Sequence, residues 1–117
     1  MHYNLEIIKH RHLSIPMPDY EFGVEIDVRD YNEILVISHD IPNEKCISLE
    51  KFFRNINPNI LLAINIKSSG IQQKLQNLLK KYKVENYFTF DWSTPELLHA
   101  IKNNLNCAFR VSEYEKN

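Results

Sequence analysis

Between Gly23 and Asp40, apolar and polar residues alternate in a pattern that predicts two strands joined by a tight turn. Glu25 and Asp27 alternate with valine and isoleucine, so a strand places both carboxylates on the same face. The apolar run ILVIS returns after the turn, and His39 at its end is expected to lie across from Glu25. Two acids and a histidine on one sheet face cost free energy unless they bind something. This hairpin is therefore the first candidate for a functional site.

Further segments have the apolar pattern of strands, namely residues 4–12, 60–67, 87–91 and 107–111. The strand predicted over 60–67 is apolar on both faces until its last residues, as strands of a parallel sheet are. Pro16 and Pro18 exclude a regular helix between the first strand and the hairpin. The crossover before the hairpin is therefore expected to be extended or a single turn.

Helical periodicity appears in three segments, namely residues 47–56, residues 69–83 and a segment that begins at Thr94. Ser48 is expected to cap the first helix. A capping box of the form Ser-x-x-Gln, beginning at Ser69, is expected to start the second. In the third helix, Leu97, Leu98 and Ile101 are expected to face the core. These helices alternate with the strands that follow the hairpin.

The alternation of strands and helices from residue 60 onward predicts an α/β fold with parallel strands and right-handed crossovers. The spacing fits a partial TIM-barrel-like (β/α) array of about five parallel strands, with the returning hairpin strand after the second. It fits a small doubly wound sheet equally well. The 117 residues allow a single domain, whereas a closed barrel has eight strands in roughly 250 residues. We therefore expect an N-terminal half of a longer barrel, an assembly of two copies, or an open sheet, and we favour the first.

The balance of acidic and basic residues limits the classes of binding partner that we expect. With 14 basic and 15 acidic residues the formal net charge is −1, so nothing in it points to nucleic acid or to an anionic membrane. The first residues lack the apolar run of a signal peptide, and no segment approaches membrane-spanning length. We therefore expect a cytoplasmic protein with no stable membrane anchor and no nucleic-acid partner.

Polar or charged residues and one tryptophan gather at the carboxyl end of each predicted strand, namely at His10, Arg11, His12, Glu25, Asp27, Arg29, Asn65, Lys67, Asp91, Trp92, Arg110 and Ser112. In parallel α/β folds these ends form the face on which active sites lie. Paired acids suit a hard divalent cation, arginine and lysine suit a phosphate, and histidines on separate strands suit acid–base catalysis. The combination points to cleavage of a phosphodiester.

The run KHRH, followed by GVEIDVRDYNEILVISHD, resembles the glycerophosphodiester phosphodiesterases and, more distantly, the phosphatidylinositol-specific phospholipase C group. The matching positions are His10–Arg11, Glu25–Ile26–Asp27, His39–Asp40 and Asn65–Ile66–Lys67. The resemblance implies a TIM-barrel fold and three pairs of roles: acid–base catalysis by His10 and His39, metal binding by Glu25 and Asp27, and phosphate contact by Arg11 and Lys67. It also implies Mg²⁺ or Ca²⁺ as cofactor and a small phosphodiester as substrate.

Two departures from the family pattern bear on activity. His12 stands where the family has a glycine, and Asn65 stands where it has a third metal-binding glutamate. A neutral amide is a weaker ligand for a hard cation than a carboxylate. The alternatives to an enzyme are thus a non-catalytic relative that binds a phosphorylated ligand and an inactive fragment of a longer enzyme.

Overall fold

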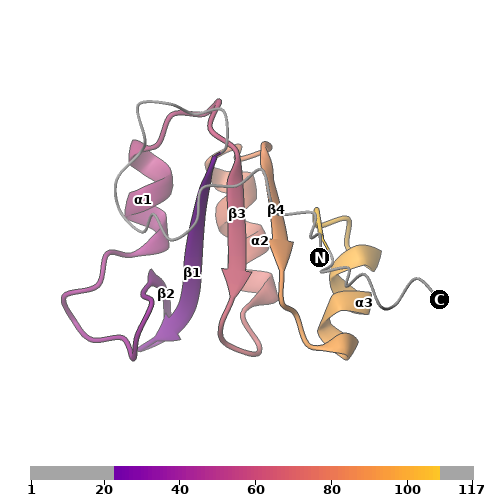
Figure 1. The fold of residues 1–117 in the computed structure, drawn as a ribbon, viewed down its shortest axis with the longest axis horizontal. Helices are drawn as coiled ribbons and strands as arrows, with labels where there is room; N and C mark the ends of the chain where they lie inside the picture. Colours follow the sequence, from indigo (N-terminus) through magenta and orange to yellow (C-terminus); the bar gives the residue numbers. More distant parts are fainter. Residues whose placement is uncertain (1–22, 109–117) are drawn as a thin grey trace, which may run out of the picture.

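The computed structural model describes residues 23–108 of the chain (Figure 1). Its elements in order are β1 (Val24–Tyr31), β2 (Ile34–Ile37), α1 (Leu49–Asn55), β3 (Leu62–Ile66), α2 (Gln72–Lys81), β4 (Tyr87–Phe90) and α3 (Thr94–Lys102). The α/β class and the alternation of strands and helices are therefore confirmed. The strand expected over 4–12, most of that over 107–111, and His10, Arg11, His12 and Arg110 lie outside the described residues.

The strands form one mixed sheet in the order β2-β1-β3-β4. β1 and β2 pair antiparallel as the predicted hairpin, while β1, β3 and β4 are parallel. Cys107 adds an isolated parallel bridge to Thr89 beyond α3. Residues 23–108 thus contain fewer parallel strands than the array expected from the sequence. The β-α-β crossovers of the observed sheet place consecutive parallel strands side by side.

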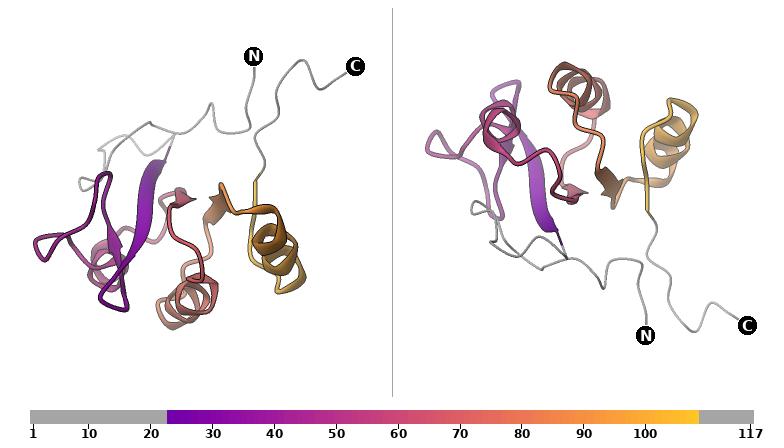
Figure 2. Two further views of the ribbon diagram at one scale, coloured as in Figure 1. Left: turned by 90° about the horizontal axis from the view of Figure 1, so that it is seen from below. Right: turned by 90° about the horizontal axis from the view of Figure 1, so that it is seen from above.

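All three helices lie on one face of the sheet, as both end-on views make clear (Figure 2). The buried side chains that pack between this face and the helices include Val24, Ile26, Leu62, Ile64, Leu49, Phe53, Leu75 and Leu79. Because side chains alternate along a strand, the intervening residues point to the other face. That face, which we call the opposite face, carries Glu25, Asp27, Ala63, Asn65, Phe88 and Phe90.

The expected N-cap of α1 is confirmed, and that of α2 is wrong. The Ser48 Oγ accepts a hydrogen bond from the Lys51 N–H at 3.0 Å. Helix α2 instead begins after Ile71, with no side-chain cap. The Gln72 side chain turns to α3, where its Oε1 accepts from the His99 Nδ1 at 2.8 Å. A tertiary contact therefore uses the amide that the capping box required.

Two of the three inward positions expected on α3 are wrong. Leu98 and Ile101 are 64% and 46% exposed, whereas Ala100 is fully buried. Leu97 is half-buried and packs against the core. The physical reason is the place of α3 beside β4, at one margin of the described sheet (Figure 1). At this place, Ala100 is buried and Leu97 packs against the core.

Glu50 links α1 to the end of α2. Its Oε2 accepts hydrogen bonds from the Lys81 Nζ at 2.7 Å and from the Tyr82 hydroxyl at 2.6 Å. These hydrogen bonds hold the pKa of the Glu50 carboxyl below its ordinary value. The carboxylate therefore stays charged at neutral pH and joins two helices that are adjacent on the sheet.

Replacing Lys83 with glycine is expected to raise the free energy of unfolding by about 0.5–1 kcal/mol. Lys83 follows α2 with a φ of 54°, and the Val84 N–H to Leu79 O bond at 2.9 Å closes the helix around it. Glycine adopts this left-handed conformation without the steric cost of a side chain. Chemical denaturation measures the change. Lys80→Gly, inside α2, is the matched control and should cost about 1 kcal/mol; equal losses in both variants would contradict the prediction.

Candidate active site

The parallel pairing of β1, β3 and β4 places residues of the sequence motifs next to one another in one row across the strands. These residues lie on the opposite face of the sheet. Asp27 on β1 pairs with Asn65 on β3, and Asn65 pairs with Phe90 on β4. Asn65 and Phe90 lie at the carboxyl ends of their strands, so this row is at the end of the sheet where active sites form in parallel folds. Glu25 lies two residues before Asp27 on the same face.

Both acids of the predicted metal pair are buried. The exposed fraction is 6% for Glu25 and 1% for Asp27. Buried carboxylates are rare in proteins unless they bind a cation or accept hydrogen bonds. The strand alternation that the sequence indicates thus places two acids where solvation by water is largely lost.

His39 is bonded to Asp27, with 3.1 Å between its Nδ1 and the Asp27 Oδ2. A carboxylate only accepts hydrogen bonds, so with Asp27 in that form the Nδ1 would be the donor of this bond. The His39 side chain is 45% exposed. The Nε2 of the same ring is therefore the atom that can exchange a proton with a bound molecule.

The sequence expectation for the partner of His39 is wrong by two residues along β1, because the ring bonds to Asp27 and not to Glu25. Strand β2 ends at Ile37, which pairs with Val28, so His39 lies beyond the ladder and not across from Glu25. The Ser38 N–H donates to the Asp27 backbone oxygen at 3.0 Å and fixes where the chain leaves the sheet. This exit directs the imidazole to the Asp27 carboxylate.

Asn65 is 3% exposed, and within residues 23–108 its Oδ1 has no hydrogen-bond partner. A buried carbonyl oxygen without a partner costs free energy, which a bound cation or donor can offset. Asn65 occupies the third position of the predicted metal motif, and the sheet register places it next to Asp27. The amide oxygen is thus held beside a carboxylate.

Lys67 follows the last residue of β3 and is exposed. Its backbone N–H donates to the Val28 oxygen at 3.0 Å, which continues the pairing of β3 with β1 past Asn65. Strand alternation therefore keeps Lys67 on the face of Asn65, toward the carboxyl end of the sheet. Of the predicted site residues, Glu25, Asp27, His39 and Lys67 are described at this end, whereas His10 and Arg11 lie outside the described residues.

The donor atoms at this end of the sheet suit a hard cation. Glu25, Asp27 and the Asn65 amide supply oxygen ligands, which Mg²⁺ and Ca²⁺ prefer. Among residues 23–108, no three His, Cys, Asp or Glu side chains are arranged to hold a metal ion. Beside Glu25 and Asp27, the Asn65 oxygen occupies the position of a third side-chain ligand.

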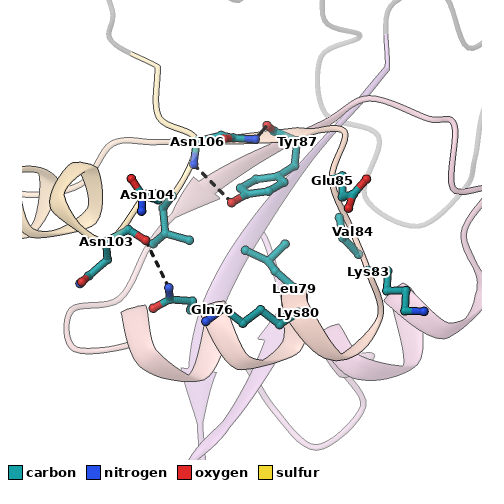
Figure 3. A pocket seen from close by; sticks show the side chains of 11 residues that line it. Gln76, Leu79, Lys80, Lys83, Val84, Glu85, Tyr87, Asn103, Asn104 and Asn106 are labelled. Carbon is teal, nitrogen blue, oxygen red and sulfur yellow. Dashed lines mark hydrogen bonds between the residues drawn. The ribbon is translucent and has the colours of Figure 1, made fainter.

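A cavity of about 580 Å³ lies elsewhere, between the ends of α2 and α3 and the amino end of β4 (Figure 3). The Asn106 N–H donates to the Tyr87 hydroxyl at 3.3 Å, and the Gln76 Nε2 donates to the Asn103 oxygen at 3.3 Å. Burial raises the pKa of the Tyr87 hydroxyl. This cavity is on the helix side and at the amino end of the strands, so it is separate from the row at Asp27.

Sequence reasoning missed the role of Arg29. Its guanidinium binds the backbone oxygens of Ser38 and His39, at 3.0 and 3.1 Å from its Nε and Nη2. The signal in the sequence was the continued alternation of Glu25, Asp27 and Arg29 on one strand. That signal shows a shared face and does not reveal which backbone atoms the arginine reaches.

No protein-family model matches the sequence, and no curated protein matches it at a significant level. The resemblance to glycerophosphodiester phosphodiesterases thus depends on the motif residues alone. None of the helices within residues 23–108 combines the length and the apolar character required to cross a bilayer.

Proposed function

We propose that this chain is a metal-assisted phosphodiesterase of the glycerophosphodiester type, which acts on a small phosphodiester. The observation that carries the proposal is the hydrogen bond between His39 and Asp27 beside the buried Asn65 oxygen. A histidine oriented by a carboxylate is a common acid–base arrangement, and clustered oxygen atoms are typical of hard-cation sites. Both occur here at the carboxyl end of one parallel sheet.

In the proposed reaction a water oxygen bonds to phosphorus and gives up one proton to a base. The bond from phosphorus to one alcohol oxygen breaks, and that oxygen takes a proton from an acid. The His39 Nε2 accepts or delivers one of these protons, while Asp27 orients the ring and stabilises the imidazolium. His10 is the proposed second acid–base group. Arg11 and Lys67 are proposed to contact the phosphate oxygens, because their charges complement a phosphodiester anion.

Glu25, Asp27 and Asn65 are the residues that would hold Mg²⁺ or Ca²⁺. A carboxylate has two oxygens, so Asp27 can bond to the imidazole through one of them and to a cation through the other. When bound, the cation would stabilise the negative charge that develops on the phosphate oxygens. The chain's own part is to keep two acids and an amide oxygen on one rigid face.

We extend the proposal to the fold, as a partial TIM-barrel-like array in which β1 is the second parallel strand, after the strand predicted over residues 4–12. The helices of the described residues lie on one face of the sheet, as in a TIM-barrel-like array (Figure 2). A doubly wound sheet carries helices on both faces. The exposed Leu98 and Ile101 on α3 also suit a further helix packed at this margin. A C-terminal half or a second copy of the chain would supply it.

The second candidate function is binding of a phosphorylated ligand without catalysis. Asn65 favours it, because a site with two carboxylates and one amide holds a divalent cation less tightly than one with three carboxylates. Hydrolysis of bis(p-nitrophenyl) phosphate by the full chain, with Mg²⁺ or Ca²⁺ and after addition of a chelator, distinguishes the two. Turnover that the chelator abolishes supports the enzyme; a folded, inert chain that binds phosphate esters supports the alternative.

Asn65→Asp is expected to strengthen Mg²⁺ or Ca²⁺ binding by about 10- to 100-fold, because it adds a negative charge next to Asp27 in a region of low dielectric. Isothermal titration calorimetry of the full chain with each cation measures the affinity. Asn77→Asp on the exposed surface of α2 adds the same charge on the helix side and should leave the affinity unchanged. Equal gains in both variants would show a non-specific charge effect, and no gain in Asn65→Asp would exclude position 65 from the cation site.

A further inference from the structure

Arg29 is the third opposite-face residue in the alternation that begins with Glu25 and Asp27. It pairs with Val36 on β2 and is half-buried. Its guanidinium donates to two consecutive backbone oxygens, from Nε to Ser38 at 3.0 Å and from Nη2 to His39 at 3.1 Å. The arginine thus binds the segment on which the candidate acid–base residue lies.

This segment lies beyond the regular pairing of β1 with β2. Strand pairing ends at Ile37, and His39 and Asp40 are exposed. Other hydrogen bonds on this segment include the Ser38 N–H to Asp27 oxygen bond and the Ser38 Oγ to Asp40 oxygen bond, at 3.0 and 2.6 Å. Without further restraint, an exposed segment after an edge strand samples many conformations. The histidine would then lose its bond to Asp27 for part of the time.

We propose that Arg29 is a positioning residue for His39, which holds the backbone so that the Nδ1 remains bonded to Asp27 and the Nε2 points away for proton transfer. The planar guanidinium has donors in a fixed fork, so it binds two neighbouring carbonyl groups at once. Lysine carries the same charge at a single nitrogen and cannot reproduce this fork. The inference rests on the proposed function for its role in catalysis, whereas the effect on the ring is independent of it.

The test compares Arg29→Lys with the wild type by nitrogen-15 NMR of the His39 ring in the full chain, with both proteins in the same buffer. In the wild type, the two ring nitrogens should show separate shifts with the proton on Nδ1. In Arg29→Lys, these shifts should converge as the ring exchanges between tautomers. Arg54→Lys, on the exposed side of α1, is the matched control and should leave the ring signals unchanged.

The kinetic arm measures hydrolysis of bis(p-nitrophenyl) phosphate. Arg29→Lys should lower kcat by about 10- to 100-fold with little change in KM, because a displaced acid–base group slows chemistry more than binding. A purely structural arginine would lower the thermal midpoint and leave the ring tautomer of the folded fraction unchanged. Circular dichroism of each variant separates loss of fold from loss of positioning.

The two proposals fail in different ways. Ring shifts that stay separate in a folded Arg29→Lys would overturn the positioning role, whether or not the chain is an enzyme. Converged shifts in a chain with no hydrolytic activity would support the positioning role and reject the phosphodiesterase. Converged shifts together with a lower kcat would support both.

Discussion

Replacing His39 with asparagine is expected to lower the rate of phosphodiester hydrolysis by about 10²- to 10⁴-fold, the usual contribution of an acid–base group. The asparagine Nδ2 can take the place of the histidine Nδ1 and donate to the Asp27 Oδ2, which keeps the buried carboxylate hydrogen-bonded. The variant therefore removes proton transfer at Nε2 and retains the structural bond. Initial rates at saturating bis(p-nitrophenyl) phosphate, with Mg²⁺ or Ca²⁺ present, measure the loss.

His99→Asn is the matched control for this experiment. His99 is on α3, on the helix side of the sheet, where its ring bonds to Gln72. Its replacement should leave the rate within a factor of about two, because its hydrogen-bond partners in residues 23–108 are Gln72 and Asn103, which are not residues of the candidate site. A His39→Asn variant with the wild-type rate would exclude His39 as an acid–base group. A wild type with no turnover in either cation would reject the enzyme and favour the phospho-ligand-binding alternative.

Replacing Gly23 with alanine is expected to destabilise the fold by about 2–5 kcal/mol, the sum of a left-handed backbone and an overpacked contact. Gly23 has a φ of 76°, and a Cβ at this position would overlap the Leu61 backbone oxygen. That oxygen cannot move aside cheaply, because it accepts the Val24 N–H at 2.9 Å at the start of the pairing between β1 and β3. The urea midpoint of unfolding measures the change.

Gly70→Ala separates the two contributions. Gly70 has nearly the same φ, 75°, but a methyl group at this position would have no heavy atom within 4 Å. Its alanine variant should lose only the conformational part, about 1–2 kcal/mol. Similar losses at both positions would show that the close approach of Gly23 to Leu61 contributes little to stability.

The amphipathic patterns were sufficient for most elements because burial in this domain follows local periodicity. Leu75 and Leu79 on α2 are buried as the helical spacing indicates, and Phe52 and Phe53 on α1 likewise. The pattern failed on α3, where Leu98 and Ile101 satisfy the same spacing but have no described element over them. Periodicity indicates which residues share a face of a helix. It does not indicate whether another element covers that face.

The sequence indicated which residues are candidates for the site, but it did not indicate which of their atoms contact one another. Alternation alone placed Glu25 and Asp27 together, since side chains on a strand repeat every second residue. The partner of His39 was predicted wrongly, because the pairing stops at Ile37 and the chain leaves the ladder before the histidine. The expected partner Glu25 and the observed partner Asp27 are two residues apart on the same strand face.

By itself, the sequence determined the hairpin from Gly23 to Asp40, the α/β alternation and the two acids on one strand face, because each depends on the chemistry of neighbouring residues. Only the tertiary structure decided that Asn65 lies beside Asp27, that Arg29 binds the segment of His39, and that the helices share one face. These depend on strand register and on crossover geometry, which join residues distant in the chain. The hydrogen-bonding groups that determine register are the same in every residue, so the side-chain pattern only limits the choice.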